Sequence, residues 1–203
     1  MRRLIETTLA LATSALICLA PPAGAVVADP AVAQIESLDA ALLSTMKQGK
    51  ALGYKGRYAR LQPAIERALD LDAMTRFAVG PTWTTLSPGQ RAGLASAFRR
   101  MTIANYAKNF DAYDGESFSV SGVETRGPDK LVRTQLARGN GAPVTLTYRM
   151  RTFNGVWKVI DVYYQGSISE LTTRRSDFAA TLRSGGPQAL IQHLDALADK
   201  LSR

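Results

Sequence analysis

The sequence has very few of the residues that usually carry catalysis or bind metals. Its 203 residues include one cysteine, Cys18, and one histidine, His193. Nucleophilic catalysis by serine or cysteine needs an activating base close to the nucleophile, and zinc sites draw on several histidine or cysteine ligands. His193 lies off the apolar stripe of the last predicted helix, so we expect it to be a solvated surface residue. We therefore expect no catalytic residue set, no metal and no cofactor.

Motifs that bind nucleotides or nucleic acids are also missing. The sequence has no P-loop and no GxGxxG, and Gly139-Asn140-Gly141 leads into a strand rather than a helix. The net charge of +8 is not gathered into a basic cluster with interleaved aromatic residues. We therefore expect no nucleic-acid partner, whereas a basic exported protein can associate with anionic lipid surfaces.

Residues 1–25 have the composition of an export signal. The basic pair Arg2-Arg3 precedes an apolar run over residues 9–20, and the small residues Ala23-Gly24-Ala25 follow it. The apolar run is shorter than the ~20 residues that span a bilayer, which disfavours an uncleaved anchor. We therefore expect a signal peptide, residues 1–25, and one exported domain, residues 26–203.

Removal of the signal peptide changes the thiol content and the charge. Cys18 lies inside the apolar run, and Ile17 before it is too large for a lipoprotein signal. The remaining chain has no thiol for a disulfide, so its stability must come from a hydrophobic core. Without Arg2, Arg3 and Glu6 the net charge is +7.

The strongest strand signal is a hairpin in the second half of the chain. Asn154-Gly155 separates two strand-like runs, and Asn-Gly favours a two-residue turn because both residues tolerate positive φ. The turn predicts that Tyr148 faces Asp161 and that Leu146 faces Tyr163. One side of the hairpin then carries the large apolar residues, namely Val144, Leu146, Tyr148, Met150, Trp157, Val159 and Tyr163.

Helices are predicted before and after the strands. The predicted helices cover residues 30–48, 63–69, 71–79, 88–113, 168–182 and 187–201; the other strands cover 117–125 and 130–137, and residues 49–56 form a loop. Ser87 and Gln90 form a capping box at the start of the long helix. This order predicts an α+β fold, in which a twisted antiparallel sheet of about four strands packs against several helices.

Asp161 is the one carboxylate on the apolar side of the predicted hairpin. A buried carboxylate needs partners or a raised pKa. It can be a structural group held by an arginine or by a hydroxyl such as that of Tyr148, or a general base or ligand anchor in a pocket. No second acid or base can be assigned to it, so we favour the structural role.

Several short motifs, in order along nearly all of residues 26–203, resemble the MlaC-type toluene-tolerance family. They are Phe77-Ala78-Val79-Gly80 with Trp83; Gln90-Arg91 with Phe98, Tyr106 and Tyr113; residues 157–162 (WKVIDV); Gly166-Ser167-Ile168; Arg174; and Phe178. The chain departs from the family at Val79-Gly80, where members often have Leu-Gly. It is also similar to the hopanoid-associated branch of this family.

The resemblance implies a periplasmic lipid-binding protein with an apolar cavity between sheet and helices. Periodicity alone leaves open whether the large apolar side chains fill an ordinary core or line such a cavity. The family implies that a phospholipid or hopanoid-type lipid is carried between an outer-membrane partner and an inner-membrane ABC-type transporter. We expect the ligand to contact Phe77, Trp83, Phe98, Met101, Tyr106, Leu146, Tyr148, Met150, Trp157, Val159 and Tyr163.

Two other functions remain open at the level of the sequence. The first is a small periplasmic α+β enzyme that uses Asp161 in a pocket, and the second is a membrane-associated structural subunit. Lipid that co-purifies with the protein would favour the carrier over the enzyme.

The export signal leads to a first prediction. Protein recovered from the periplasmic fraction should begin at Val26 or Asp29, because the small residues before these positions suit signal peptidase. Intact-mass spectrometry measures this directly. A full-length species in the inner membrane would contradict the prediction.

Overall fold

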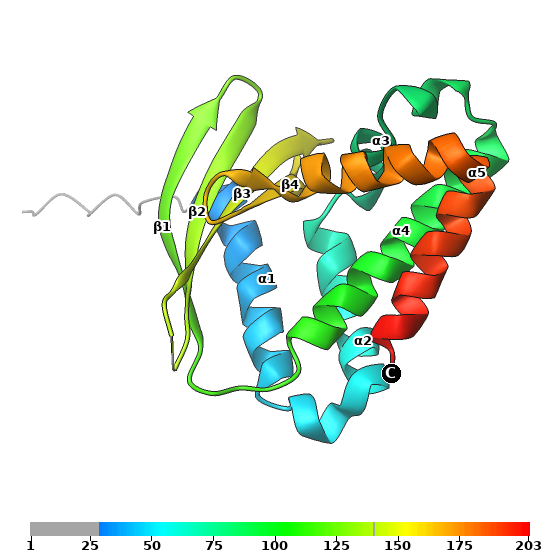
Figure 1. Cartoon of the computed structure of the whole chain (residues 1–203). Coiled ribbons are helices and arrows are strands. Elements are labelled where there is room, and N and C mark those ends of the chain that lie inside the picture. Colours follow the sequence, from blue (N-terminus) through cyan, green and yellow to red (C-terminus); the bar gives the residue numbers. More distant parts are fainter. Residues whose placement is uncertain (1–28, 140) are drawn as a thin grey trace, which may run out of the picture.

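An antiparallel sheet forms one side of the protein and helices form the other (Figure 1). The computed structural model describes residues 29–139 and 141–203, so the predicted signal peptide lies outside the described residues. The helices before the sheet are α1 (Pro30–Met46), α2 (Gly49–Ala68), α3 (Leu71–Val79), the 3₁₀ helix η1 (Gly80–Thr85) and α4 (Pro88–Asn109). The strands are β1 (Ser117–Arg126), β2 (Asp129–Ala137), β3 (Val144–Phe153), β4 (Val156–Tyr164) and β5 (Ile168–Ser169), and α5 (Glu170–Leu201) ends the chain.

The strands pair in sequence order, β1-β2-β3-β4-β5, which confirms the predicted α+β class. The four long strands are those that alternation predicted, whereas β5, a strand of two residues, was not predicted. Its residues pair with Tyr163 and Tyr164 and lead directly into α5. A pair this short has no periodicity from which to predict it.

Side chains cap the helices at the predicted starts. The Asp29 carboxylate accepts a hydrogen bond from the amide of Ala31 at 2.9 Å. Ser87 and Gln90 form the full capping box, in which each side chain bonds to the backbone amide of the other residue. These helix starts could be predicted from the sequence because a cap depends only on neighbouring residues.

The predicted loop over residues 49–56 is wrong, because this segment belongs to helix α2. Only Gly53, with φ 58° and ψ 179°, departs from helical geometry, so α2 consists of two helical parts that meet at a kink at this glycine. The following turn is held by Arg57, whose guanidinium donates to the carbonyl of Ala107 on α4 at 2.7 Å and to that of Gly49 at 2.9 Å. The local sequence does not predict such a contact between distant segments.

Strands β3 and β4 pair in the predicted register from the Asn154-Gly155 turn to the middle of the strands, and the register shifts beyond that point. Met150 pairs with Val159 as expected, but Tyr148 pairs with Val162 instead of Asp161. Ile160 is therefore the extra residue of a β-bulge.

The bulge exchanges the two faces for the remainder of β4. Val162 and Tyr164 face the helices, whereas Asp161 and Tyr163 face outward, with Asp161 opposite Arg149. The prediction that Asp161 and Tyr163 share the apolar face is thus wrong. The bulge adjoins a contact outside the hairpin, where the Asp70 amide donates to the carbonyl of Val159 at 2.9 Å.

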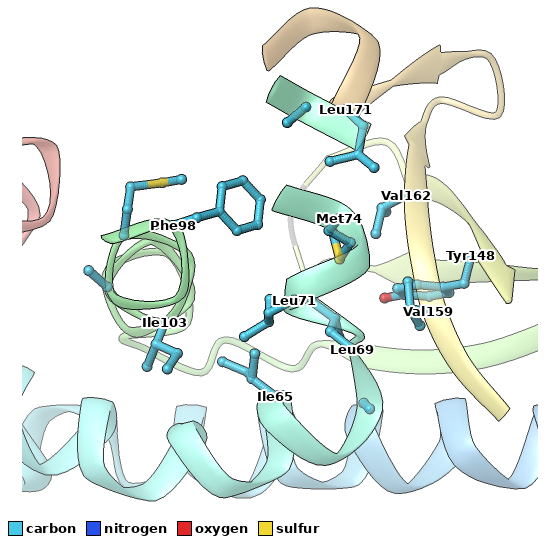
Figure 2. Packing of buried hydrophobic residues seen from close by; sticks show 14 of the residues in the cluster. Ile65, Leu69, Leu71, Met74, Phe98, Ile103, Tyr148, Val159, Val162 and Leu171 are labelled. Carbon is cyan, nitrogen blue, oxygen red and sulfur yellow. The ribbon is translucent and has the colours of Figure 1, made fainter. Parts of the chain in front are cut away.

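The core lies between the inner face of the sheet and helices α1, α3 and α4. Figure 2 shows Met74 of α3 between Phe98 of α4 and Val162 of β4. Phe98 is 1 % exposed and meets Phe178 of α5 edge to face, with 6.2 Å between the ring centres. Helix α3 thus fills the space beside the bulged part of β4.

Helix α5 contains the two predicted C-terminal helices, joined by a bend at Gly186, where φ is 68°. Beyond the bend its second half runs beside α4 (Figure 1). Among residues 29–139 and 141–203, none of the helices combines the length and apolar character that a membrane span requires.

A buried ion pair on the outer face of the sheet leads to a second prediction. The Asp129 carboxylate, 3 % exposed, accepts hydrogen bonds from Arg149 at 2.7 Å and from Arg151 at 3.0 Å. Burial alone would raise the pKa of Asp129, but the bonds from Arg151 and Arg149 hold this pKa below its usual value of 3.8. Asp129→Asn should lower the free energy of unfolding at pH 7 by about 1–3 kcal/mol, because a charge-assisted pair is lost.

Urea unfolding at several pH values tests this prediction. A lowered folded-state pKa stabilises the protein above the unfolded value of 3.8, and the gain is lost as the pH falls further. The difference between wild type and Asp129→Asn should therefore shrink below about pH 4. Glu124→Gln, which alters only exposed pairs, is the control and should change stability little. A difference that persists at pH 2 would contradict the proposed charge effect.

Candidate functional site

A cavity of about 560 Å³ lies between helix α4 and the inner face of strands β2, β3 and β4. We call it the sheet cavity. Its volume falls within the range of pockets that hold small ligands. It occupies the part of the sheet that α3 does not cover, since α3 packs beside the bulge in β4.

The walls of the sheet cavity are mainly apolar and aromatic. They come from α1, α4 and three strands: Met46, Tyr106, Phe110, Leu136, Val144, Leu146, Tyr148, Val162 and Tyr164. Tyr106 and Phe110 stack with 5.7 Å between ring centres, and Phe118 of β1 lies behind Phe110 at 6.4 Å. Stacked aromatic rings give this wall a fixed shape.

Polar residues also line the sheet cavity. They are Asn105, Asn109, Glu116, Arg138 and Glu170. Asn109 and Arg138 are exposed, whereas Tyr148 is 1 % exposed. The cavity therefore has an apolar interior and a polar side that meets solvent, which suits an amphipathic ligand.

Buried oxygen atoms lie near the inner end of the cavity. Burial raises the pKa values of the Tyr106 and Tyr148 hydroxyls, and the negative charge of Asp39 adds to both increases. Asp39, on α1, is 5 % exposed, and among the described residues its Oδ1 has no hydrogen-bond partner. Burial, with a smaller contribution from Glu36, raises the pKa of Asp39 to about 7. Both tyrosines are therefore neutral at pH 7.

The structure divides the predicted ligand-contacting residues into three groups. Tyr106, Leu146 and Tyr148 line the sheet cavity. A second group, Phe98, Met101, Met150 and Val159, is packed in the core with at most 2 % exposure. A third group, Phe77, Trp83, Trp157 and Tyr163, lies outside the cavity lining.

The third group is divided between two hollows and a strand position on the surface. Phe77 and Trp83 line a hollow at α3 and η1, and Phe77 also lines a second hollow together with Tyr163. Trp157 lies under the ammonium group of Lys130, which is 4.8 Å from its ring centre. These residues do not converge on one site.

Sequence reasoning missed several residues that line the cavity. Val162 and Tyr164 were missed because the bulge reverses their direction. Met46, Phe110, Leu136 and Val144 lie on predicted apolar faces, so the alternation and helical periodicity contained a signal for them. Nothing in the sequence indicated which end of these faces stays uncovered by α3.

Asp161 joins the sheet to helix α5. Its Oδ1 accepts hydrogen bonds from the amides of Val162 at 2.8 Å and Leu171 at 3.3 Å, and its Oδ2 accepts one from the Ser169 hydroxyl at 2.7 Å. Ser169 in turn caps α5 by accepting from the amide of Thr172 at 3.0 Å. Both carboxylate oxygens are thus occupied by contacts that fix the start of the helix.

The described part of the chain has no cluster of three or more histidine, cysteine, aspartate or glutamate residues that could hold a metal ion. His193 is exposed on α5. Among the described residues, the hydrogen-bond partners of Asp161 are two backbone amides and a serine hydroxyl, and none of these is a second acid or base.

The contacts of Asp161 lead to a third prediction. Asp161→Asn should lower the free energy of unfolding by about 1–3 kcal/mol, because an amide nitrogen replaces one of the two accepting oxygens. Denaturant unfolding measures the loss, and Asp177→Asn, on the exposed surface of the same helix, is the control. An Asp161→Asn protein as stable as wild type would show that the carboxylate has no structural role.

No match was found among curated proteins. Among solved structures, the chain is similar to a phospholipid-binding protein from Ralstonia solanacearum, determined in complex with a phospholipid. The TM-score is 0.75 at 23% sequence identity, and the match covers 85% of this chain and 99% of that one. The MlaC protein family matches residues 36–196, so the chain belongs to the MlaC family.

Proposed function

We propose that this protein is a periplasmic lipid-binding carrier. In the proposed complex, acyl chain lies in the sheet cavity and the polar head stays near the exposed residues Asn109 and Arg138. The sheet cavity is the observation that carries the proposal, since it combines about 560 Å³ of space with apolar walls and a polar side.

The energetics of lipid transfer explain why such a cavity is needed. Exposing an acyl chain to water costs about 0.8 kcal/mol for each CH₂ group. Two chains of ordinary length therefore cost on the order of 20 kcal/mol, which prevents unassisted transfer across an aqueous gap. A protein that replaces water with apolar side chains removes most of this barrier and needs no chemical step.

Family and fold both support the proposal. The MlaC family is periplasmic, which agrees with the export signal predicted over residues 1–25. The similar protein from Ralstonia solanacearum was determined with a bound phospholipid. A phospholipid is accordingly the first cargo to test, with a hopanoid-type lipid as the second.

Some of the expected residues contact the lipid directly in this proposal, whereas others only support the cavity. Tyr106, Leu146 and Tyr148 touch the acyl chain in this proposal, together with the further apolar residues of the cavity wall. Met150 and Val159 do not touch the lipid in this proposal. They belong to the core that supports the sheet at the end covered by α3.

We further propose that the protein acts without catalysis and exchanges lipid with membrane partners. Both oxygens of Asp161, the residue considered as an enzymatic base, are engaged in structural hydrogen bonds. The proposed partners are an inner-membrane ABC-type lipid transporter and an outer-membrane complex. A carrier with a reversible apolar site can serve transfer in either direction.

A charge placed inside the cavity gives a fourth prediction. Leu146→Glu should reduce co-purifying lipid at least about ten-fold, because the apolar wall would then hold an unpaired carboxylate. Organic extraction and mass spectrometry of protein purified without detergent measure the lipid-to-protein ratio. Only protein with the wild-type circular dichroism spectrum is compared.

The neighbouring residue provides a matched control. Thr145 lies on the opposite face of the same strand, so Thr145→Glu adds the same charge outside the cavity and should leave bound lipid unchanged. Undiminished lipid in a folded Leu146→Glu protein, or a wild-type protein that never carries lipid, would refute the proposed function.

A further inference from the structure

Three arginine side chains line one hollow at the junction of α3 and η1. The hollow has a volume of about 540 Å³, and we call it the arginine hollow. It is formed by Arg76, Phe77, Gly80, Trp83, Thr84, Arg91 and Arg175. The sheet cavity shares none of these residues, so the two sites are separate.

The positive charge of the arginine hollow is not neutralised by the described part of the chain. No carboxylate lines it, and Arg76, Arg91 and Arg175 are absent from the ion pairs formed among the described residues. By contrast, Glu116 and Glu170 accompany the one arginine of the sheet cavity. An anionic group outside the protein is therefore attracted to the hollow more than to the cavity.

Two of the arginines lie against η1, and one of them is hydrogen-bonded to its backbone. Arg91 donates from Nε to the carbonyl of Trp83 and from Nη2 to that of Thr84, both at 3.0 Å. Arg175 lies directly on Gly80, where a Cβ atom would come within 2.7 Å of its Nε. Gly80 has a φ of 70°, a conformation that favours glycine.

Exposed aromatic and aliphatic side chains accompany this charge. Phe77 is 42 % exposed, and Trp83 is half-buried with the Arg91 guanidinium 5.8 Å from its ring centre. An adjoining hollow shares Phe77 and Arg175 and also contains Ile168, which is 56 % exposed. Tryptophan beside arginine is typical of residues that reside in the headgroup region of a membrane.

We propose that the arginine hollow docks this protein on an anionic lipid bilayer. The guanidinium groups bind headgroup phosphates, for which their planar donor geometry is well suited, while Trp83 and Phe77 enter the interface beside them. Helix α3, which contributes Arg76 and Phe77 to the hollow, lies on the helical side, away from β1 (Figure 1). This inference does not depend on which lipid the cavity carries.

Co-sedimentation with vesicles tests the docking surface. The purified protein should bind vesicles of phosphatidylcholine with 30 mol % phosphatidylglycerol, taken as a probe composition, and binding should weaken as salt is raised. The double variant Arg76→Gln/Arg175→Gln should lower the partition coefficient about 25-fold at low salt, since one arginine contributes about five-fold near an anionic surface.

A charge-matched variant separates this surface from general attraction. Lys50→Gln/Arg67→Gln removes the same charge from exposed positions on α2 and should lower binding less than about three-fold. An equal loss in both double variants would overturn the proposal, as would equal binding to pure phosphatidylcholine vesicles. A wild-type protein that does not bind the anionic vesicles would also overturn it and would direct attention to an acidic protein partner.

Tryptophan fluorescence gives a local readout. The chain has two tryptophans, so Trp157→Phe leaves Trp83 as the only tryptophan, whose emission can be excited selectively at long wavelength. Its emission should shift to the blue on anionic vesicles and not on neutral ones. An unshifted spectrum at full vesicle binding would place the contact elsewhere and overturn the assignment. Lipid extracted from the same protein reports on the cavity separately.

Discussion

Strand β4 is the element through which the sheet and the helices are joined. One edge of it pairs with β3, and the other accepts the amide of Asp70 at Val159 and pairs with β5 further along. Asp161, between these points, binds the hydroxyl that caps α5 and an amide in its first turn. The positions of α3 and α5 on the sheet therefore follow from contacts made by a few residues of one strand.

The location of the sheet cavity is a consequence of this attachment. Helix α3 is held beside Val159, where Met74 and Leu71 fill the space between α4 and the sheet (Figure 2). At the other end, around Leu136 and Val144, α3 does not cover the inner face, and α4 passes above it. The same apolar surface thus becomes core at one end and cavity wall at the other.

The difference between local and long-range contacts explains which parts of the protein could be predicted from the sequence. The capping box at Ser87 and the turn at Asn154-Gly155 depend on neighbouring residues, and alternation located the four long strands. The bulge at Ile160 and the helical conformation of residues 49–56 involve contacts with distant segments, so both were misjudged. Leu146 and Tyr148, which precede the bulge, were expected on the apolar face that lines the cavity, whereas Val162 and Tyr164 were missed because the bulge reverses their direction.

The buried carboxyl group of Asp39 links folding to proton binding. Its pKa is about 7 in the folded protein against 3.8 for the free side chain, so the folded state keeps a proton that the unfolded chain releases above pH 4. Because the pKa of Asp39 is raised on folding, its contribution to the free energy of unfolding is greatest below pH 4 and declines as the pH rises toward 7. The lowered pKa of Asp129 acts in the opposite direction below pH 4. Together these two aspartates favour a maximum of stability in weakly acidic solution, although the chain itself is strongly basic.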